Sequence, residues 1–207
     1  MLEDALAREA EAHRLLLAGD ADGAREKLAE VAGLYRRSWE AAGPRSLGRL
    51  IGMLKAAVLA DGGEDEAAYV RRELGDQPDS PAGFYALALA ALMEADDEVA
   101  RGAGSGMREG GDAFARTADA IEALADGDGD RYSAALRTIV ADFEAREEHL
   151  TGVPIADTAV VLERLAATRG MAARVASPLV PDTLLRSDAV RFPPDEPGGS
   201  GQGRGDG

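Results

Sequence analysis

Leu16-Leu17-Ala18-Gly19-Asp20 closes one helix-like apolar run and opens the next, and this pattern returns three more times along the chain. Glycine tolerates the left-handed conformation that ends a helix, and aspartate caps the helix that follows. The turns lie roughly 32 to 42 residues apart, close to the periods of helix-turn-helix repeats, whose units bury their apolar faces against one another. The pattern therefore predicts stacked helical hairpins. The other three turns are Leu59-Ala60-Asp61-Gly62, Leu92-Met93-Glu94-Ala95-Asp96 and Leu124-Ala125-Asp126-Gly127-Asp128.

The composition favours one all-α domain. The chain has 207 residues, of which 45% are hydrophobic and 4% aromatic, which is enough apolar content for one core of ordinary size. Alanine and leucine dominate, whereas strands draw on β-branched and aromatic residues. We expect stacked antiparallel helical hairpins, similar to a tetratricopeptide array, over residues 1–186. Residues 187–207 are rich in proline and glycine and are expected to form a disordered tail.

The formal net charge is −15 at pH 7. A surface of this sign repels nucleic-acid phosphates and anionic membranes, so we expect neither as a partner. Two interpretations of the acidity remain open. One is a solvated surface that reflects a high-salt cytoplasm, or the arginine bias of a GC-rich genome. The other is an acidic face that complements a basic protein partner.

The chain has no cysteine, so it offers no disulfide, no thiolate nucleophile and no cysteine ligand for zinc. Its first residues, from Met1 to Glu9, are acidic and amphipathic, unlike the basic and then apolar start of a signal peptide. The longest nearly apolar stretch, from Ala82 to Met93, is too short to span a bilayer. These features predict a cytoplasmic location and no membrane partner.

Apolar residues at helical spacing place the expected helices. The run from Phe84 to Met93 is apolar on nearly all sides, which is typical of a helix surrounded by others, so it is expected to form the centre of the core. The expected helices span residues 2–18 and 20–42, 47–60 and 64–74, 81–93 and a segment starting near 96, 112–125 and 130–150, and finally 155–168.

Two segments are expected to depart from regular helices. Five glycines lie within residues 102–111, and each costs about 1 kcal/mol relative to alanine inside a helix. They predict a short helix after Asp96 and then a loop. Residues 171–185 contain Pro178 and Pro181 and are expected to form an extended arm, or one short strand, across the last helices.

The acidic string Asp126-Gly127-Asp128-Gly129-Asp130 begins like a calcium-binding loop. Such a loop also needs glycine at its sixth position and a bidentate glutamate at its twelfth. These positions hold Arg131 and Arg137. We therefore interpret the string as an acidic turn that caps a helix.

The string Gly102-Ala103-Gly104-Ser105-Gly106 has only a superficial likeness to a phosphate-binding loop. It follows no predicted strand, lacks the third glycine of the dinucleotide fingerprint and contains no Gly-Lys-Ser/Thr. Ser105 is not in a nucleophile elbow either, because the positions two residues away hold Ala103 and Met107 instead of glycine. We interpret the string as a flexible loop between helices.

The two histidines, His13 and His149, lie in different predicted hairpins, and neither has a metal-binding or catalytic motif around it. We expect His13 to share a helix face with Glu9, and His149 to stand at the C-terminal end of a helix. Tyr35 and Trp39 form an i,i+4 aromatic pair that either packs in the core, the simpler interpretation, or anchors a protein partner. The sequence therefore assigns no catalytic, cofactor-binding or metal-ligating residue and no cofactor.

A family resemblance lies mainly in residues 143–185. The small-residue apolar helix Ile155-Ala156-Asp157-Thr158-Ala159-Val160-Val161-Leu162-Glu163-Arg164-Leu165-Ala166 is followed by the turn Arg169-Gly170, an extended hydrophobic segment and the proline motif Ser177-Pro178-Leu179-Val180-Pro181. This order resembles the closing segment of the immunity protein 49 family of bacterial polymorphic toxin systems, although the strong acidity and the Gly-rich centre depart from that family. The resemblance implies a cytoplasmic, non-enzymatic protein that binds and neutralises a cognate toxin. It assigns no contact residues.

Three functional hypotheses follow. An immunity protein would use its acidity to attract a basic toxin such as a nuclease. A tetratricopeptide-like scaffold would hold a peptide or a protein subunit in a concave groove, although the full Trp-x-x-Leu-Gly-x-x-Tyr pattern is absent. A hydrolase that uses only carboxylates has no supporting cluster and ranks last. The sequence therefore favours a non-enzymatic protein-binding module, and the immunity protein ranks above the scaffold.

Overall fold

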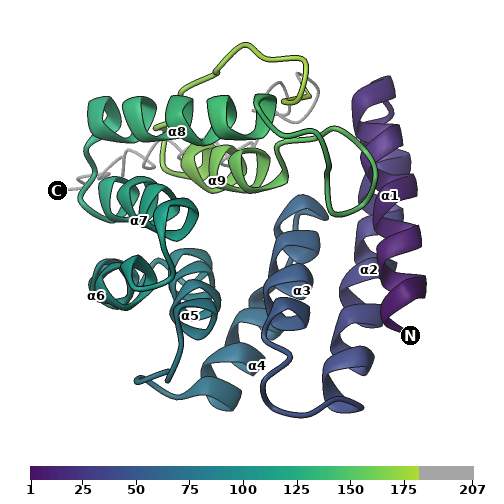
Figure 1. Ribbon diagram of the computed structural model, residues 1–207, viewed down its shortest axis with the longest axis horizontal. Helices are drawn as coiled ribbons and strands as arrows, with labels where there is room; N and C mark the ends of the chain where they lie inside the picture. Colours follow the sequence, from purple (N-terminus) through teal and green to yellow (C-terminus); the bar gives the residue numbers. More distant parts are fainter. Residues whose placement is uncertain (182–207) are drawn as a thin grey trace, which may run out of the picture.

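The computed structural model describes residues 1–181, and within them the chain forms nine α-helices and no strand (Figure 1). The predicted all-α class is confirmed. The helices are α1 (Leu2–Ala18), α2 (Ala21–Glu40), α3 (Gly48–Leu59), α4 (Glu64–Leu74), α5 (Pro81–Met93), α6 (Asp97–Arg108), α7 (Asp112–Ala125), α8 (Gly129–Glu144) and α9 (Asp157–Thr168).

The first eight helices form four consecutive hairpins, and neighbouring hairpins pack against one another (Figure 1). The ninth helix, α9, does not extend this series. It contacts α7 and α8 of the fourth hairpin, which precedes it, and also α3 of the second hairpin, which is far away in the sequence. The array therefore closes on its own last helix.

The four turns within the hairpins share one backbone geometry. In the first turn, the N–H of Gly19 donates to the carbonyl of Leu16, and the N–H of Asp20 donates to the carbonyl of Leu15. The other three turns repeat this pair of bonds. It is the Schellman arrangement, which satisfies the carbonyls at a helix end and places one residue in the left-handed region. That residue is Gly19, Asp61, Ala95 or Gly127, with φ between 57° and 88°.

Aspartates then cap three of the helices that follow these turns. The side chains of Asp20, Asp96 and Asp128 each accept a hydrogen bond from the backbone N–H three residues later. The interpretation of residues 126–130 as a helix-capping turn is therefore confirmed. The second turn has no such cap, because Gly63 precedes α4.

The Gly-rich segment is helical, so the prediction of a flexible loop at residues 102–106 is wrong. A Cβ atom on Gly106 would overlap the ring of Phe84 in α5. A Cβ atom on Gly104 would overlap the carboxylate of Glu122 in α7. The small residues let α6 approach both neighbours closely, and this packing offsets their low helix propensity.

The core runs through the middle of the array, as the sequence predicts. Every residue from Tyr85 to Leu92 in α5 is buried. Tyr35 and Trp39 are only 3% and 8% exposed, which confirms core packing for this aromatic pair. Within residues 1–181, no helix has an apolar stretch long enough to cross a membrane.

Two helix boundaries near the C-terminus differ from the prediction. Helix α8 ends at Glu144 and α9 begins at Asp157, so residues 145–156 form a loop. The helix ends early because no large apolar residue follows Phe143 before Leu150, and an isolated polar turn has nothing to bury.

The predicted extended arm is confirmed for residues 171–181, which return along the last two helices without forming a strand. The Leu179 carbonyl accepts a hydrogen bond from the N–H of Ala156 just before α9. The buried carboxylate of Glu163 accepts hydrogen bonds from the backbone N–H groups of Ala173 and Arg174. The rest of the arm, the predicted domain end at residue 186 and the predicted tail 187–207 lie outside the described residues.

Candidate functional site

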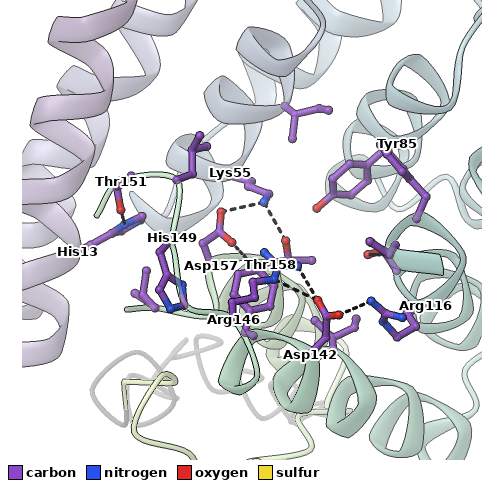
Figure 2. A pocket seen from close by; sticks show the side chains of 18 of the residues that line it. His13, Lys55, Tyr85, Arg116, Asp142, Arg146, His149, Thr151, Asp157 and Thr158 are labelled. Atoms are coloured by element: carbon purple, nitrogen blue, oxygen red, sulfur yellow. Dashed lines mark hydrogen bonds and ion pairs between the residues drawn. The ribbon is translucent and has the colours of Figure 1, made fainter. Parts of the chain in front are cut away.

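A pocket of about 260 Å³ lies where six helices meet loop 145–156 (Figure 2). Helices α1, α3, α5, α7, α8 and α9 each contribute to its wall. The wall combines apolar side chains with charged and hydroxyl-bearing ones. The polar lining residues are His13, Lys55, Tyr85, Arg116, Thr117, Asp142, Arg146, His149, Thr151, Asp157 and Thr158.

Lys55 of α3 lies at the base of the pocket. Its Nζ donates to Asp157 Oδ2 at 2.9 Å and to Thr158 Oγ1 at 2.8 Å, both at the start of α9. Burial lowers the pKa of Lys55, but the charge of Asp157 outweighs burial and raises this pKa above its ordinary value. Burial likewise raises the pKa of Asp157, and Lys55 brings it below its ordinary value. Both groups are therefore charged at neutral pH, and their ion pair joins α3 to α9.

A second charged cluster lies nearer the mouth of the pocket. Asp142 of α8 forms an ion pair with Arg116 of α7. Its Oδ2 atom also accepts hydrogen bonds from Nη2 and Nε of Arg146, at 2.6 and 3.2 Å. The side chain of Arg146 is 39% exposed, whereas that of Lys55 is 13% exposed. The pocket therefore leads from an open rim beside Arg146 to a nearly closed base.

Both histidines line this pocket, although the sequence placed them in separate hairpins without partners. His13 is 2% exposed, and its Nδ1 lies 3.2 Å from Thr151 Oγ1. Burial lowers the pKa of His13 to about 4, so its ring is neutral at pH 7. His149 lies in loop 145–156, where its ring stacks on that of Phe143 of α8, so the prediction that His149 stands at a helix end is wrong. The predicted shared face of His13 and Glu9 is confirmed, since both are buried on α1.

Tyr85 directs its hydroxyl into the pocket, beside Lys55 and Thr158 (Figure 2). Its ring packs edge-on against Phe114, with ring centroids 6.1 Å apart. Tyr85 is 7% exposed, and within residues 1–181 its hydroxyl makes no hydrogen bond of acceptable geometry. Burial raises the pKa of Tyr85, so the hydroxyl keeps its proton. The pocket thus holds a buried donor that lacks an acceptor, at a cost of about 1–3 kcal/mol.

Glu9 lies behind the pocket and does not line it. The hydroxyl of Tyr35 donates to its Oε2 at 2.7 Å. Burial raises the pKa of Glu9 to about 7, even though the bond from Tyr35 acts in the opposite direction. This carboxyl is enclosed in the packing between α1 and α2, where no substrate can reach it.

The chemistry of the pocket is suited to binding. Lys55 and the two arginines are each paired with a carboxylate, so none of them is a free base or a neutral nucleophile. The Nδ1 of His13 lies 3.2 Å from the hydroxyl of Thr151, but burial lowers the pKa of His13 to about 4, so this ring is a poor base for activating that hydroxyl. In the part of the chain that the structure describes, no three histidine, aspartate or glutamate side chains gather as metal ligands.

Sequence reasoning missed this site because its parts are far apart in the chain. Lys55 and Asp157 are separated by 102 positions. One signal was present: Lys55 is the single charge in the apolar run from Leu50 to Leu59, and a lone charge on a buried helix indicates a buried ion pair. Comparisons of the chain with protein-family models, with curated proteins and with solved structures find no match.

Proposed function

We propose that this chain is a non-enzymatic protein-binding module of the cytoplasm, an immunity protein that binds and neutralises a cognate toxin. The pocket supports binding over catalysis, because its lysine and arginines are paired with carboxylates and because His13, which lies beside the Thr151 hydroxyl, has a pKa lowered to about 4. The segment that resembles the immunity protein 49 family contributes loop 145–156 and α9, which form one wall of this pocket.

The observation that carries the proposal is the exposed surface of loop 145–156. Leu150 is 81% exposed, more than any other large apolar side chain among residues 1–181. Glu147 and Glu148 are exposed beside it, and neither forms an ion pair with a described residue. We call Glu147, Glu148 and Leu150 the acidic tip. An exposed leucine with free carboxylates around it suits a partner that offers an apolar depression rimmed by lysine or arginine.

The charge of the whole chain supports the same class of partner. A net charge of −15 attracts a basic protein over long range and speeds its association. Toxins that cleave nucleic acids have basic surfaces because they bind phosphates. An acidic inhibitor would compete for the same surface of such a toxin.

The position of α9 argues against the alternative, a tetratricopeptide-like scaffold. Helix α9 lies against α3 and α7, the first helices of the second and fourth hairpins, and eight of its twelve residues are buried. Repeat scaffolds bind their ligands on an open concave surface. In this chain, α9 itself packs against α3 and α7, so it covers surface that a repeat scaffold would leave open for a ligand.

The test is affinity capture of the tagged full chain from the lysate of its own host at host-like salt, followed by mass spectrometry and toxicity assays. The proposal predicts a stoichiometric basic protein that kills cells when expressed alone and is harmless when this chain is present. Recovery of housekeeping subunits, or of nothing while circular dichroism reports an intact helical fold, would contradict the proposal.

A further inference from the structure

We propose that the pocket under loop 145–156 binds a small monocarboxylate with an apolar body. The pocket adjoins the acidic tip, since Leu150 also lines it, but the proposal does not depend on the identity of any protein partner. Its support comes from the unused hydrogen-bonding groups of the wall, the charge balance of the wall, and the apolar surface between them.

The unused polar groups at the base of the pocket are donors. Lys55 has three N–H groups, of which two are donated to Asp157 and Thr158. The oxygen of Thr158 accepts one of these bonds, which leaves its own hydroxyl proton to be donated. Tyr85 adds a buried hydroxyl that has no hydrogen bond within the described chain. Three donors therefore converge on one space (Figure 2).

The carboxylate oxygens of the same wall each accept a hydrogen bond already. Asp157 accepts from Lys55 through Oδ2 and from the backbone N–H of Thr158 through Oδ1. Asp142 accepts from Arg116 through Oδ1 and from Arg146 through Oδ2. A ligand that supplied further donors would have to share a carboxylate oxygen that already accepts a bond, or use the buried Nδ1 of His149, whereas a ligand that supplies acceptors would satisfy the hydroxyl of Tyr85.

The charge of the wall favours a monoanion. Three cationic side chains, those of Lys55, Arg116 and Arg146, face two carboxylates, those of Asp142 and Asp157. This leaves one positive charge, in a protein whose net charge is −15. One carboxylate would balance it, whereas a phosphate dianion would add an unpaired negative charge to a partly buried site.

Apolar side chains form the rest of the wall and call for an apolar body on the ligand. A volume of about 260 Å³ has room for a single ring or a short branched chain beside the carboxylate. Such a ligand would place its apolar part against these side chains and its carboxylate near Tyr85. The apolar residues of the wall include Ile51, Phe114, Ile139, Val153 and Ile155.

Three ring compounds of one shape test the proposal on the full chain by calorimetry and by two-dimensional NMR. Benzoate is the anionic probe, benzamide is neutral and benzamidine is cationic. We expect benzoate to bind with one-to-one stoichiometry and to show nuclear Overhauser contacts to methyl groups of Ile51 and Ile139. We expect benzamide to bind at least about tenfold more weakly, benzamidine not to bind, and inorganic phosphate to bind more weakly than benzoate.

Tyr85→Phe is the decisive variant, and Tyr69→Phe, outside the pocket, is its matched control. Because the hydroxyl of Tyr85 makes no hydrogen bond of acceptable geometry within residues 1–181, its removal is expected to leave the free chain as stable as the parent or more stable. It is expected to weaken benzoate binding by about tenfold, since a hydrogen bond to a charged group is lost. Tyr69→Phe is expected to leave benzoate binding unchanged.

Each other outcome overturns the proposal. Absence of benzoate binding at millimolar concentration, or contacts outside the pocket, would show that the pocket is not a carboxylate site. Equal or tighter binding of benzamide, benzamidine or phosphate would contradict the chemistry assigned to the ligand. Unchanged benzoate affinity in Tyr85→Phe would remove the donor on which the argument rests.

Discussion

Glu9 and His13 are both buried one helical turn apart on α1, and burial reverses the order of their pKa values. Burial raises the pKa of Glu9 from 4.5 to about 7 and lowers the pKa of His13 from 6.5 to about 4. Both residues are therefore neutral in the folded chain near pH 5.5, whereas both are charged in the unfolded chain. Glu9 accepts a hydrogen bond from Tyr35. The charges of Asp157 and Lys55 also affect the pKa values of Glu9 and His13.

The two shifts have opposite effects on stability. The raised pKa of Glu9 favours folding at low pH, and this contribution is lost as the pH rises from 4.5 to about 7. The lowered pKa of His13 favours folding at high pH, and this contribution is lost as the pH falls from 6.5 to about 4. Between pH 4.5 and 6.5 the two contributions change in opposite directions and largely cancel.

Single variants should separate the two contributions to the pH dependence of stability. Relative to the parent, Glu9→Gln should become more stable as the pH rises from 4.5 to 6.5, by about 2 kcal/mol, because the Glu9 penalty is gone. His13→Asn should become less stable over the same range by a similar amount. The measurement is the free energy of unfolding in urea at several pH values. Parallel curves for the two variants would contradict the assignment of these pKa shifts.

At the scale of the element, the hairpin turns make a prediction about Ala95. This exposed residue adopts φ 57°, the position that glycine occupies in the turns at Gly19 and Gly127. A left-handed conformation costs a residue with a Cβ about 1 kcal/mol. Ala95→Gly should therefore stabilise the chain by up to about 1 kcal/mol, and Gly19→Ala should destabilise it by a similar amount. A loss of stability in Ala95→Gly, measured by thermal unfolding, would rule out the Schellman geometry at this turn.

The helical character of α6 predicts opposite effects at two of its glycines. Gly102 faces open space, so Gly102→Ala should stabilise the chain by roughly 0.5–1 kcal/mol through helix propensity alone. Gly106 lies against the ring of Phe84, so Gly106→Ala should destabilise it by about 1–3 kcal/mol. Chemical denaturation measures both. If this segment were a flexible loop, both variants would have nearly the same stability as the parent.

The helices were predictable where the determinants are local. The Asp/Gly turns, the caps and the apolar spacing each lie within a few residues, and they placed α4 and α7 at their observed bounds. The glycines of α6 led to the wrong prediction of a loop. Their low helix propensity can be seen locally in the sequence, whereas the close approach of Phe84 from α5, which favours small residues, cannot. The end of α8 was missed for a related reason, since the polar residues after Glu144 are compatible with a helix but have no neighbour to bury them.

At the scale of the molecule, the site could not be predicted, because folding brings together side chains from six helices. The charge of Lys55 within an apolar run was visible in the sequence, but its partner Asp157 lies 102 positions away. Single-sequence patterns report which face of a helix is buried, not which distant helix covers it. The same limit applies to Tyr85, whose unpaired hydroxyl is evident only once the neighbouring helices are placed.

The acidic tip gives the central functional claim its sharpest test. Glu147→Lys/Glu148→Lys reverses the charge of the tip. Its matched control, Asp76→Lys/Asp79→Lys, makes the same change at two exposed aspartates in the loop between α4 and α5, on the opposite side of the molecule in Figure 1. The net charge changes equally in the two variants, so any difference in their toxin binding is due to where the charges lie on the surface.

The decisive measurement is the survival of cells that co-express the captured toxin with the parent chain, the tip variant or the control variant, together with the affinity of each purified pair at host-like salt. We predict that the parent and the control protect the cells, while the tip variant binds about tenfold or more weakly and fails to protect them although its helical fold is intact. Full protection by the tip variant, or an equal loss in the control, would contradict the account.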